Sequence, residues 1–322
     1  MLSRAADSLF WMARNIERAE TSARLIDINL VSMLENFDPD IDTDPYRWES
    51  LISISGNKEQ FYELYEQCDT RSVINFLAFS IENPDSILNN IVVSRENART
   101  IRGMIPQELW ELINSFYLKI KEYPSDQWEI ENIGYFFQMV KDQSIQFQGI
   151  VNAMMSRGEA YTFLKMGKYL ERAGKIARIL DENIHHSIES RFAKEVIEHH
   201  QWSSVLHSVS GYEAYLEMYR SAIEPDQVME FLTFNKNYPR SILFSVERLI
   251  EAFDEMEQDK VQHYNRDLFI ALGKLHSELK FGTIREVLNE GVNSWYHNIQ
   301  DNCYQIGNLI SRTYYLGELD VK

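Results

Sequence analysis

The sequence is poor in the residues that interrupt regular structure. It contains 13 Gly and 7 Pro in 322 residues, which argues against a loop-rich architecture and favours long regular elements. No run of alternating β-branched residues is long enough to indicate a strand. Apolar residues recur at helical spacing along most of the chain. We therefore expect an all-α protein.

Cysteine, basic residues and long apolar runs are also scarce. The two cysteines, Cys68 and Cys303, form no metal or redox motif, which favours a reducing cytoplasmic setting. No segment approaches the roughly 20 apolar residues of a membrane span, and the first residues, MLSRAADSLFW, lack the apolar core of a signal peptide. Acidic residues outnumber basic ones by 49 to 32, and a net charge of -17 repels nucleic acid and anionic membranes. We expect a cytoplasmic protein that binds neither.

One stretch of the sequence occurs twice. Residues 9–29 read LFWMARNIERAETSARLIDIN, and residues 163–183 read FLKMGKYLERAGKIARILDEN. At a constant offset of 154, the identical positions are Met12, Glu17, Arg18, Ala19, Ala23, Arg24, Asp27 and Asn29 in the first copy. A turn of about 100° per residue gives each copy one apolar stripe with small residues in the middle. Both copies are predicted to be amphipathic helices that another helix can approach closely.

Each copy contains a Glu-Arg dipeptide, at positions 17–18 and 171–172. Adjacent residues on a helix do not face each other, so each side chain must find its partner elsewhere. Two interpretations remain open. In one, Glu17 pairs with Arg172 and Glu171 with Arg18, which fixes the register of two packed helices. In the other, the same groups line a cavity that binds an anionic peptide or an acyl-phosphate-like species.

The remaining sequence indicates short and medium helices with brief connections. The first helix is predicted from Ser3 to Leu34. The segments expected to follow are 48–54, 57–68, 70–81, 85–103 with Asn83 as cap and Pro84 at its first position, a helix opened by Pro106 and closed by Pro124, and one from Ser125 or Asp126 to Gly149. Helices of these lengths with short connections predict an antiparallel helical bundle.

Weaker matches extend the repeat beyond the first helix. Residues 155–157 match residues 2–4, and Trp48 with Gly56 matches Trp202 with Gly211. At a shorter offset, Pro84-Asp85 matches Pro225-Asp226 and residues 99–101 match residues 240–242. We predict a single domain over residues 1–322, formed by repeat halves 1–154 and 155–322 that pack around a pseudo-two-fold axis.

Three blocks resemble the bacterial alpha-E family, a helical domain with a Glu-Arg motif. They read LSRAADSLFWMARNIERAE, SRENARTIRGMIPQELWE and MSRGEAYTFLKMGKYLERAGKIARIL, in that order. The chain departs from the family pattern at Lys168 and Gly158. The resemblance implies an all-helical fold without an established activity. It also implies an association with a circularly permuted ATP-grasp ligase and a transglutaminase-like peptidase, and hence a role in making or modifying a peptide or amide-linked metabolite.

Charged residues in these blocks are the candidates for a functional site. The catalytic candidates are Glu17, Glu171 and Glu159, and the binding candidates are Arg4, Arg14, Arg18, Arg95, Asn97, Arg99, Arg157 and Arg172. The leading hypothesis is an accessory or substrate-presenting subunit. One alternative is an amide- or aminoacyl-transfer enzyme with Glu17 or Glu171 as general base, which requires a carboxylate of raised pKa in a cavity. The other alternative is a structural scaffold without a polar pocket.

No metal or cofactor is predicted. A di-iron bundle needs two Glu-x-x-His pairs, and the sequence has this spacing only from Glu182 to His185. The pairs His185-His186 and His199-His200 are placed at a helix junction. Residues 38–49 have the acidic spacing of a calcium loop at Asp38, Asp40, Asp42 and Glu49, but Thr43 replaces the glycine that the sharp turn needs. We interpret this segment as a solvated acidic loop.

Overall fold

The computed structural model describes residues 3–35, 45–123, 128–189, 195–257 and 262–315. These residues form fifteen α-helices, one π-helix and two 3-10 helices, and they contain no strand. The prediction of an all-α fold is therefore confirmed. No helix in these ranges is long and apolar enough to cross a membrane.

Two long helices, α1 and α8, begin the two parts of the chain. The elements up to residue 154 are α1 (Ser3–Glu35), α2 (Pro45–Ser55), α3 (Lys58–Leu64), α4 (Thr70–Ile74), the π-helix Asn75–Phe79, α5 (Ile87–Thr100), the 3-10 helix Arg102–Met104, α6 (Gln107–Lys121) and α7 (Ile130–Met154). The elements after residue 154 are α8 (Glu159–Glu189), α9 (Glu195–Ser208), α10 (Tyr212–Tyr219), α11 (Pro225–Phe234), α12 (Ile242–Glu257), the 3-10 helix His263–Asn265, α13 (Arg266–Phe281), α14 (Ile284–Glu290) and α15 (Val292–Tyr314).

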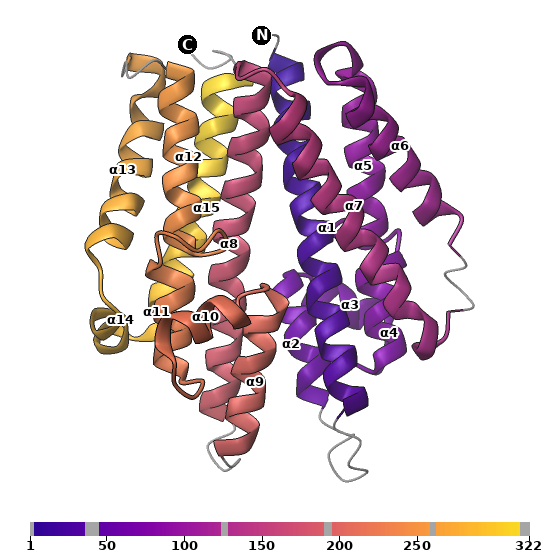
Figure 1. The fold of residues 1–322 in the computed structure, drawn as a ribbon, viewed down its shortest axis with the longest axis vertical. Coiled ribbons are helices and arrows are strands. Elements are labelled where there is room, and N and C mark those ends of the chain that lie inside the picture. The colour runs from indigo at the N-terminus through magenta and orange to yellow at the C-terminus, as the bar shows by residue number, and fades with distance from the viewer. Residues whose placement is uncertain (1–2, 36–44, 124–127, 190–194, 258–261, 316–322) are drawn as a thin grey trace.

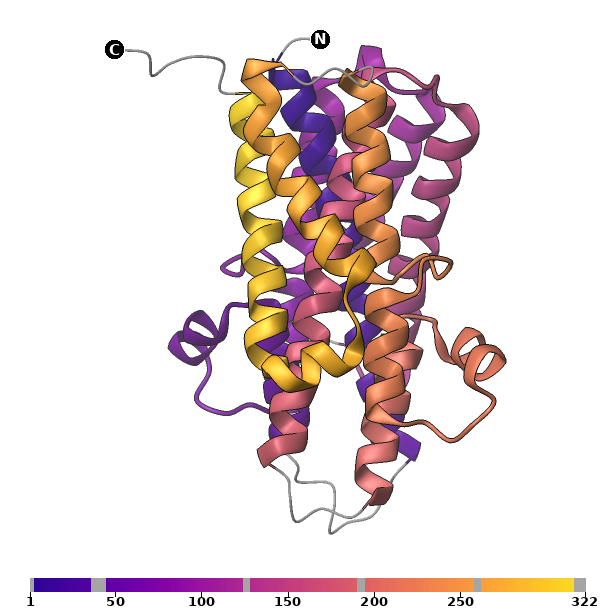
Figure 2. The same ribbon diagram turned by 90° about the vertical axis from the view of Figure 1, so that its left-hand side faces the viewer.

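Helices α1 and α8 run side by side through the middle of the molecule (Figure 1). Helices α5, α6 and α7 lie on one side of this central pair, and α12, α13 and α15 lie on the other (Figure 1). The turned view shows the long helices reaching one end of the molecule, while the short helices gather toward the opposite end (Figure 2). Two shorter helices contact the long helix of the other part of the chain: α2 packs against α8, and α9 packs against α1. The central pair is therefore contacted from both parts of the chain.

Small residues bring the two central helices close together. Ala19 on α1 and Ala173 on α8 are fully buried. A Cβ atom on Gly167 would lie 2.3 Å from the backbone oxygen of Phe10, so only glycine fits the backbone approach at this point. Small residues in the middle of each stripe thus allow the contact that the sequence predicts.

We expect Ala19→Leu or Ala173→Leu to lower the free energy of unfolding by about 1–3 kcal/mol, because added methylenes overpack a tight core contact. Urea denaturation monitored by circular dichroism measures this change. Ala153→Leu is the matched control, since Ala153 is exposed on α7. Equal stability of all three variants and the parent would show that α1 and α8 are not tightly packed at Ala19 and Ala173.

Several predicted helix ends differ from the structure. Asn83 does not cap a helix that opens at Pro84. Its buried side chain instead accepts a hydrogen bond from the backbone N–H of Asp85 at 2.9 Å, and Ser86 caps α5 through the N–H of Asn89. The turn chemistry of asparagine and serine moves the helix start three residues along the chain. The predicted helices 57–68 and 70–81 are also shorter in the structure. The first corresponds to α3 (Lys58–Leu64), and the second to α4 (Thr70–Ile74) followed by the π-helix Asn75–Phe79.

The match of residues 99–101 to residues 240–242 does not join equivalent structural positions, since one lies at the end of a helix and the other at the start of a helix. Arg99 and Thr100 end α5, whereas Ser241 precedes α12 and accepts a hydrogen bond from the N–H of Phe244. A better match places Pro84, Ser86, Ile87 and Leu88 opposite Pro239, Ser241, Ile242 and Leu243 at an offset of 155. Duplication of the chain itself stays a prediction.

The acidic calcium-like segment cannot be compared with the structure, because Asp38, Asp40, Asp42 and Thr43 lie outside the described residues. Its last position, Glu49, forms an ion pair with Lys58 at 2.9 Å. Residues 124–127, where the helix after Pro124 was expected to begin, also lie outside the described ranges. Helix α7 begins at Ile130 and continues five residues past the predicted end at Gly149, to Met154.

Candidate functional site

Glu17 on α1 and Arg172 on α8 form a buried, bidentate ion pair. Arg172 Nε donates to Glu17 Oε1 at 2.6 Å, and Arg172 Nη2 donates to Glu17 Oε2 at 2.8 Å. The side chain of Glu17 is 0% exposed and that of Arg172 is 7% exposed. Two parallel N–H bonds to a carboxylate combine strength with a fixed geometry. The pair therefore holds α1 and α8 in one register, as the first of the two interpretations predicts.

Glu171 on α8 makes the reciprocal contacts to α1. Arg14 Nε donates to its Oε2 at 2.7 Å, and Arg18 Nε donates to its Oε1 at 2.5 Å. Arg18 Nη1 also donates to Asp85, which precedes α5, at 2.7 Å. Glu171 is buried, but Arg14 and Arg18 are 18% and 20% exposed. The Glu171 cluster thus opens to solvent on its arginine side, whereas the Glu17 pair does not.

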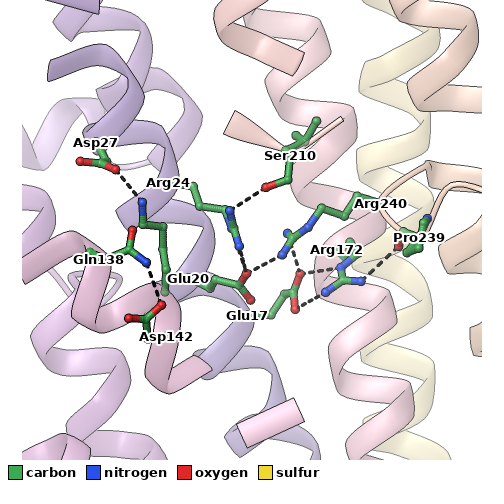
Figure 3. A network of polar contacts seen from close by, with 12 residues as sticks. Glu17, Glu20, Arg24, Asp27, Gln138, Asp142, Arg172, Ser210, Pro239 and Arg240 are labelled. Carbon is green, nitrogen blue, oxygen red and sulfur yellow. Dashed lines mark hydrogen bonds and ion pairs between the residues drawn. The ribbon is translucent and has the colours of Figure 1, made fainter. Parts of the chain in front are cut away.

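The Glu17 pair continues into a closed network around Glu20, which Figure 3 shows from close by. Arg240 lies 3.6 Å from Glu17 and donates a hydrogen bond to Glu20. Arg24 Nε donates to Glu20 at 2.9 Å, and Arg24 Nη1 donates to Ser210 at 2.8 Å. Glu20 is 1% exposed. Every carboxylate of this network is therefore matched by guanidinium groups inside the protein.

The pKa values of the two glutamates are lowered, which is opposite to the shift that a general base needs. Burial alone would raise the pKa of Glu17, but the charges of Arg172 and Arg240 outweigh burial and lower it. Burial acts on Glu171 in the same direction, and Arg14 and Arg18 lower its pKa to about 2. A base poised to accept a proton near neutral pH needs the opposite shift. The direction of both shifts and the pairing of both carboxylates with arginines therefore argue against the transfer-enzyme alternative with Glu17 or Glu171 as base.

A cleft of about 240 Å³ opens beside Glu171, between α1, α8, α15 and the turn that follows α2. This volume far exceeds the roughly 10–15 Å³ that a single water needs, so the cleft can hold a small molecule. Its charged lining consists of Arg14, Arg18, Asp85, Glu171, Lys175 and Arg178. Four cations thus face two carboxylates, and both carboxylates are already paired with Arg14 or Arg18.

Lys175 and Arg178 are the two cations of the cleft that form no ion pair with a carboxylate among the described residues. Arg178 Nε donates to the neutral Gln300 at 3.2 Å. Its guanidinium lies over Gly56, where a Cβ atom would come within 2.4 Å of Nη1 and where the backbone has a φ of +85°. Burial lowers the pKa of Lys175 to about 8, with a further contribution from Arg18, because Glu171 offsets these effects only in part. The lining of the cleft therefore carries more positive than negative charges.

The other predicted site residues lie apart from these clusters. Arg4 is exposed in the first turn of α1, and Glu159 is exposed at the first residue of α8. Arg157 is exposed as well, donates to the backbone oxygen of Asn152 at 2.6 Å and stacks on Tyr161 at 4.1 Å. Sequence proximity to the Glu-Arg motif does not bring these side chains to it.

The predicted residues of the middle block form a separate group on α5. Arg95 donates to Asn114 of α6 at 2.9 Å, and its guanidinium lies 4.6 Å from the ring centre of Tyr117. Arg99 is exposed and pairs with Glu96 at 2.6 Å. Asn97 is half-buried on the same helix. The single site expected from the sequence is therefore divided, and only Arg14, Arg18 and Arg172 join the two glutamates.

Sequence reasoning did not select six charged residues that complete the clusters, namely Glu20, Arg24, Asp85, Lys175, Arg178 and Arg240. The match of residues 84–88 to residues 239–243 could have found two of them, because it aligns Asp85 with Arg240 immediately before the caps of α5 and α12. Lys175 and Arg178 follow Glu171 by one helical turn and two turns, so a helical projection places them on its flank.

Among the described residues, no group of three or more His, Cys, Asp or Glu side chains is arranged to hold a metal ion. His199 and His200 are exposed on α9, with their rings 6.0 Å apart in an edge contact. The side chains of His185 and His186 lie outside the description. The two cysteines are free thiols, with Cys303 buried at the cleft wall.

Comparison with known proteins gives one match. The model of the Alpha-E family, described as a predicted alpha-helical domain with a conserved ER motif, matches residues 1–315. Neither the comparison with curated proteins nor that with solved structures found a match. The matched range includes both Glu-Arg dipeptides, at 17–18 and 171–172, which form the reciprocal pairs between α1 and α8.

Proposed function

Since this chain belongs to the alpha-E family of helical domains, we propose that it is an accessory, substrate-binding subunit that contributes binding rather than bond chemistry. The observation that carries this proposal is the pairing of both motif glutamates with arginines beside an open cationic cleft. A paired carboxylate of lowered pKa serves position and charge balance rather than proton transfer. A polar cleft is also what a pure scaffold would lack.

The partner classes come from the resemblance in sequence. We propose that the subunit works with an ATP-grasp amide ligase and a transglutaminase-like peptidase, in the synthesis or modification of a peptide or amide-linked metabolite. Amide ligases of this kind join an activated carboxylate to an amine, so a helper protein that holds a carboxylate-bearing substrate fits such a system. The excess of cations in the cleft supports this assignment.

Binding to the ligase tests the proposal. The circularly permuted ATP-grasp protein encoded nearest to this gene should form a complex with the purified full chain at low salt, with a Kd below about 10 μM. Sedimentation velocity and biolayer interferometry both measure this affinity, and an ATP-grasp ligase from an unrelated pathway is the matched control. Absence of a complex at low salt, or equal binding to both ligases, would contradict the proposal.

A further inference from the structure

The cleft beside Glu171 has a filled counterpart elsewhere in the same molecule. The offset of 154 that aligns α1 with α8 places Glu17 opposite Glu171, Arg18 opposite Arg172 and Arg24 opposite Arg178. The same offset places Gly174 opposite Glu20. In the filled cluster, the Glu20 carboxylate occupies the space between the guanidinium groups of Arg24 and Arg240. In the cleft, glycine supplies no side chain at the corresponding position.

The consequence is visible in the partners of the two matched arginines. Arg24 donates to the Glu20 carboxylate, one helical turn before it, at 2.9 Å. Arg178 has only hydrogen as the side chain of Gly174 one turn before it, and it donates to the neutral Gln300 instead. The turn against which each arginine lies also corresponds, since Ser210 near Arg24 and Gly56 near Arg178 both have positive φ. The Glu20 carboxylate therefore fills the place beside Arg24, whereas the corresponding place beside Arg178 is open.

We propose that the cleft binds the carboxylate of a small molecule or of a short peptide end, held by Lys175 and Arg178 beside the place that Gly174 leaves open. Arg178 corresponds to Arg24 of the filled cluster, whereas Asp85 stands where that cluster has Arg240, so Lys175 supplies the second cation. The ligand carboxylate would receive charge-assisted hydrogen bonds from both cations, which are stronger than neutral ones. Arg14 and Arg18 stay engaged with Glu171 and form the floor of the site. The size of the cleft, about 240 Å³, suits a ligand of a few to about a dozen heavy atoms rather than a nucleotide.

The charge of the cleft favours a dianion. Arg14, Arg18, Lys175 and Arg178 carry four positive charges, and Asp85 and Glu171 carry two negative ones, which leaves an excess of two. This patch contrasts with the net charge of -17 on the whole chain. A ligand with one carboxylate at Arg178 and a second anionic group toward Arg14 would balance it. The inference rests on the proposed substrate-binding role for its biological meaning, but the site can be tested on the protein alone.

Glutarate, a five-carbon dicarboxylate, is the probe for calorimetric titration of the full chain. We expect saturable binding of glutarate and none of glutaramide, its neutral isostere. Lys175→Met should weaken glutarate binding by about tenfold or more, because it removes one charge-assisted contact. Gly174→Glu should abolish binding, since it places a carboxylate four residues before Arg178, as Glu20 is placed before Arg24. A Cβ atom at Gly174 lies 3.6 Å from that of Cys303, an ordinary contact that permits the side chain.

Lys168→Met is the matched control. Lys168 lies on α8 two turns before Lys175, and burial lowers its pKa to about 8 as well, but it does not line the cleft. It should leave glutarate affinity unchanged, and circular dichroism of each variant establishes that the fold is intact. Equal affinity of the parent and Lys175→Met, or no glutarate binding by the parent, would overturn the site. Tighter binding of inorganic phosphate than of glutarate would overturn the carboxylate assignment. Because no ligase is present, either failure is distinct from failure of the ligase complex.

Discussion

Glu17→Gln should lower the free energy of unfolding by about 3–5 kcal/mol, the usual cost of leaving a buried charge without its partner. Arg172 is 7% exposed and depends on Glu17 for both of its charge-assisted contacts to a carboxylate. The neutral amide keeps the shape of the glutamate but removes the carboxylate that pairs with the guanidinium group of Arg172. Guanidinium chloride denaturation at pH 7, followed by circular dichroism, measures the change.

Two comparison variants separate loss of charge balance from a general defect. Glu17→Leu combined with Arg172→Met should recover most of the lost stability, since apolar residues of similar volume often replace a buried ion pair without cost. Glu171→Gln should cost less than Glu17→Gln, because Arg14 and Arg18 open onto the cleft, where water solvates them. If Glu17→Gln and Glu171→Gln lower the stability equally, the distinction between a closed and an open cluster is wrong.

The central contact of the fold could be predicted from the sequence for a simple geometric reason. A Glu-Arg dipeptide on a helix cannot pair with itself, so two copies of the dipeptide on two similar helices can satisfy each other. Alanines in the middle of each apolar stripe indicated that the two helices approach closely. Both features depend on helical periodicity alone, which is the strongest signal in a single sequence.

A cavity lined by the Glu-Arg groups was one of the two interpretations of the sequence, but the position of the open cleft could not be predicted, because it results from the missing side chain at Gly174. Gly174 appears in the sequence as one glycine in a helix, and its importance emerges only when α15 and the turn at Gly56 are placed around it. The partners Asp85 and Arg240 were also missed, since both lie in turns whose local hydrogen bonding decides where the next helix starts. Arg157 and Arg95 were wrongly assigned to the site because they lie in the matched sequence blocks. Arg157 contacts the nearby backbone of Asn152, and Arg95 contacts α6.

The contribution of Glu171 to stability should disappear in acid. Its pKa is lowered from 4.5 to about 2 in the folded protein, so the unfolded chain takes up the proton first as the pH falls. The contribution is therefore complete above about pH 5 and declines as the pH falls from 4.5 toward 2. Its size is at most about 3.5 kcal/mol, since one pKa unit corresponds to about 1.4 kcal/mol.

Urea denaturation of the parent and of Glu171→Gln at two pH values measures this contribution. The difference in free energy of unfolding should be largest at about pH 6 and should fall to less than about half of that value near pH 3. Glu217→Gln, an exposed position on α10, is the control and should match the parent at both pH values. A difference for Glu171→Gln that stays constant across this range would mean that the side chain acts through its shape rather than its charge. In that case the charge of Glu171 would not hold Arg14 and Arg18 in place, and these arginines would not form a fixed floor for the proposed carboxylate site.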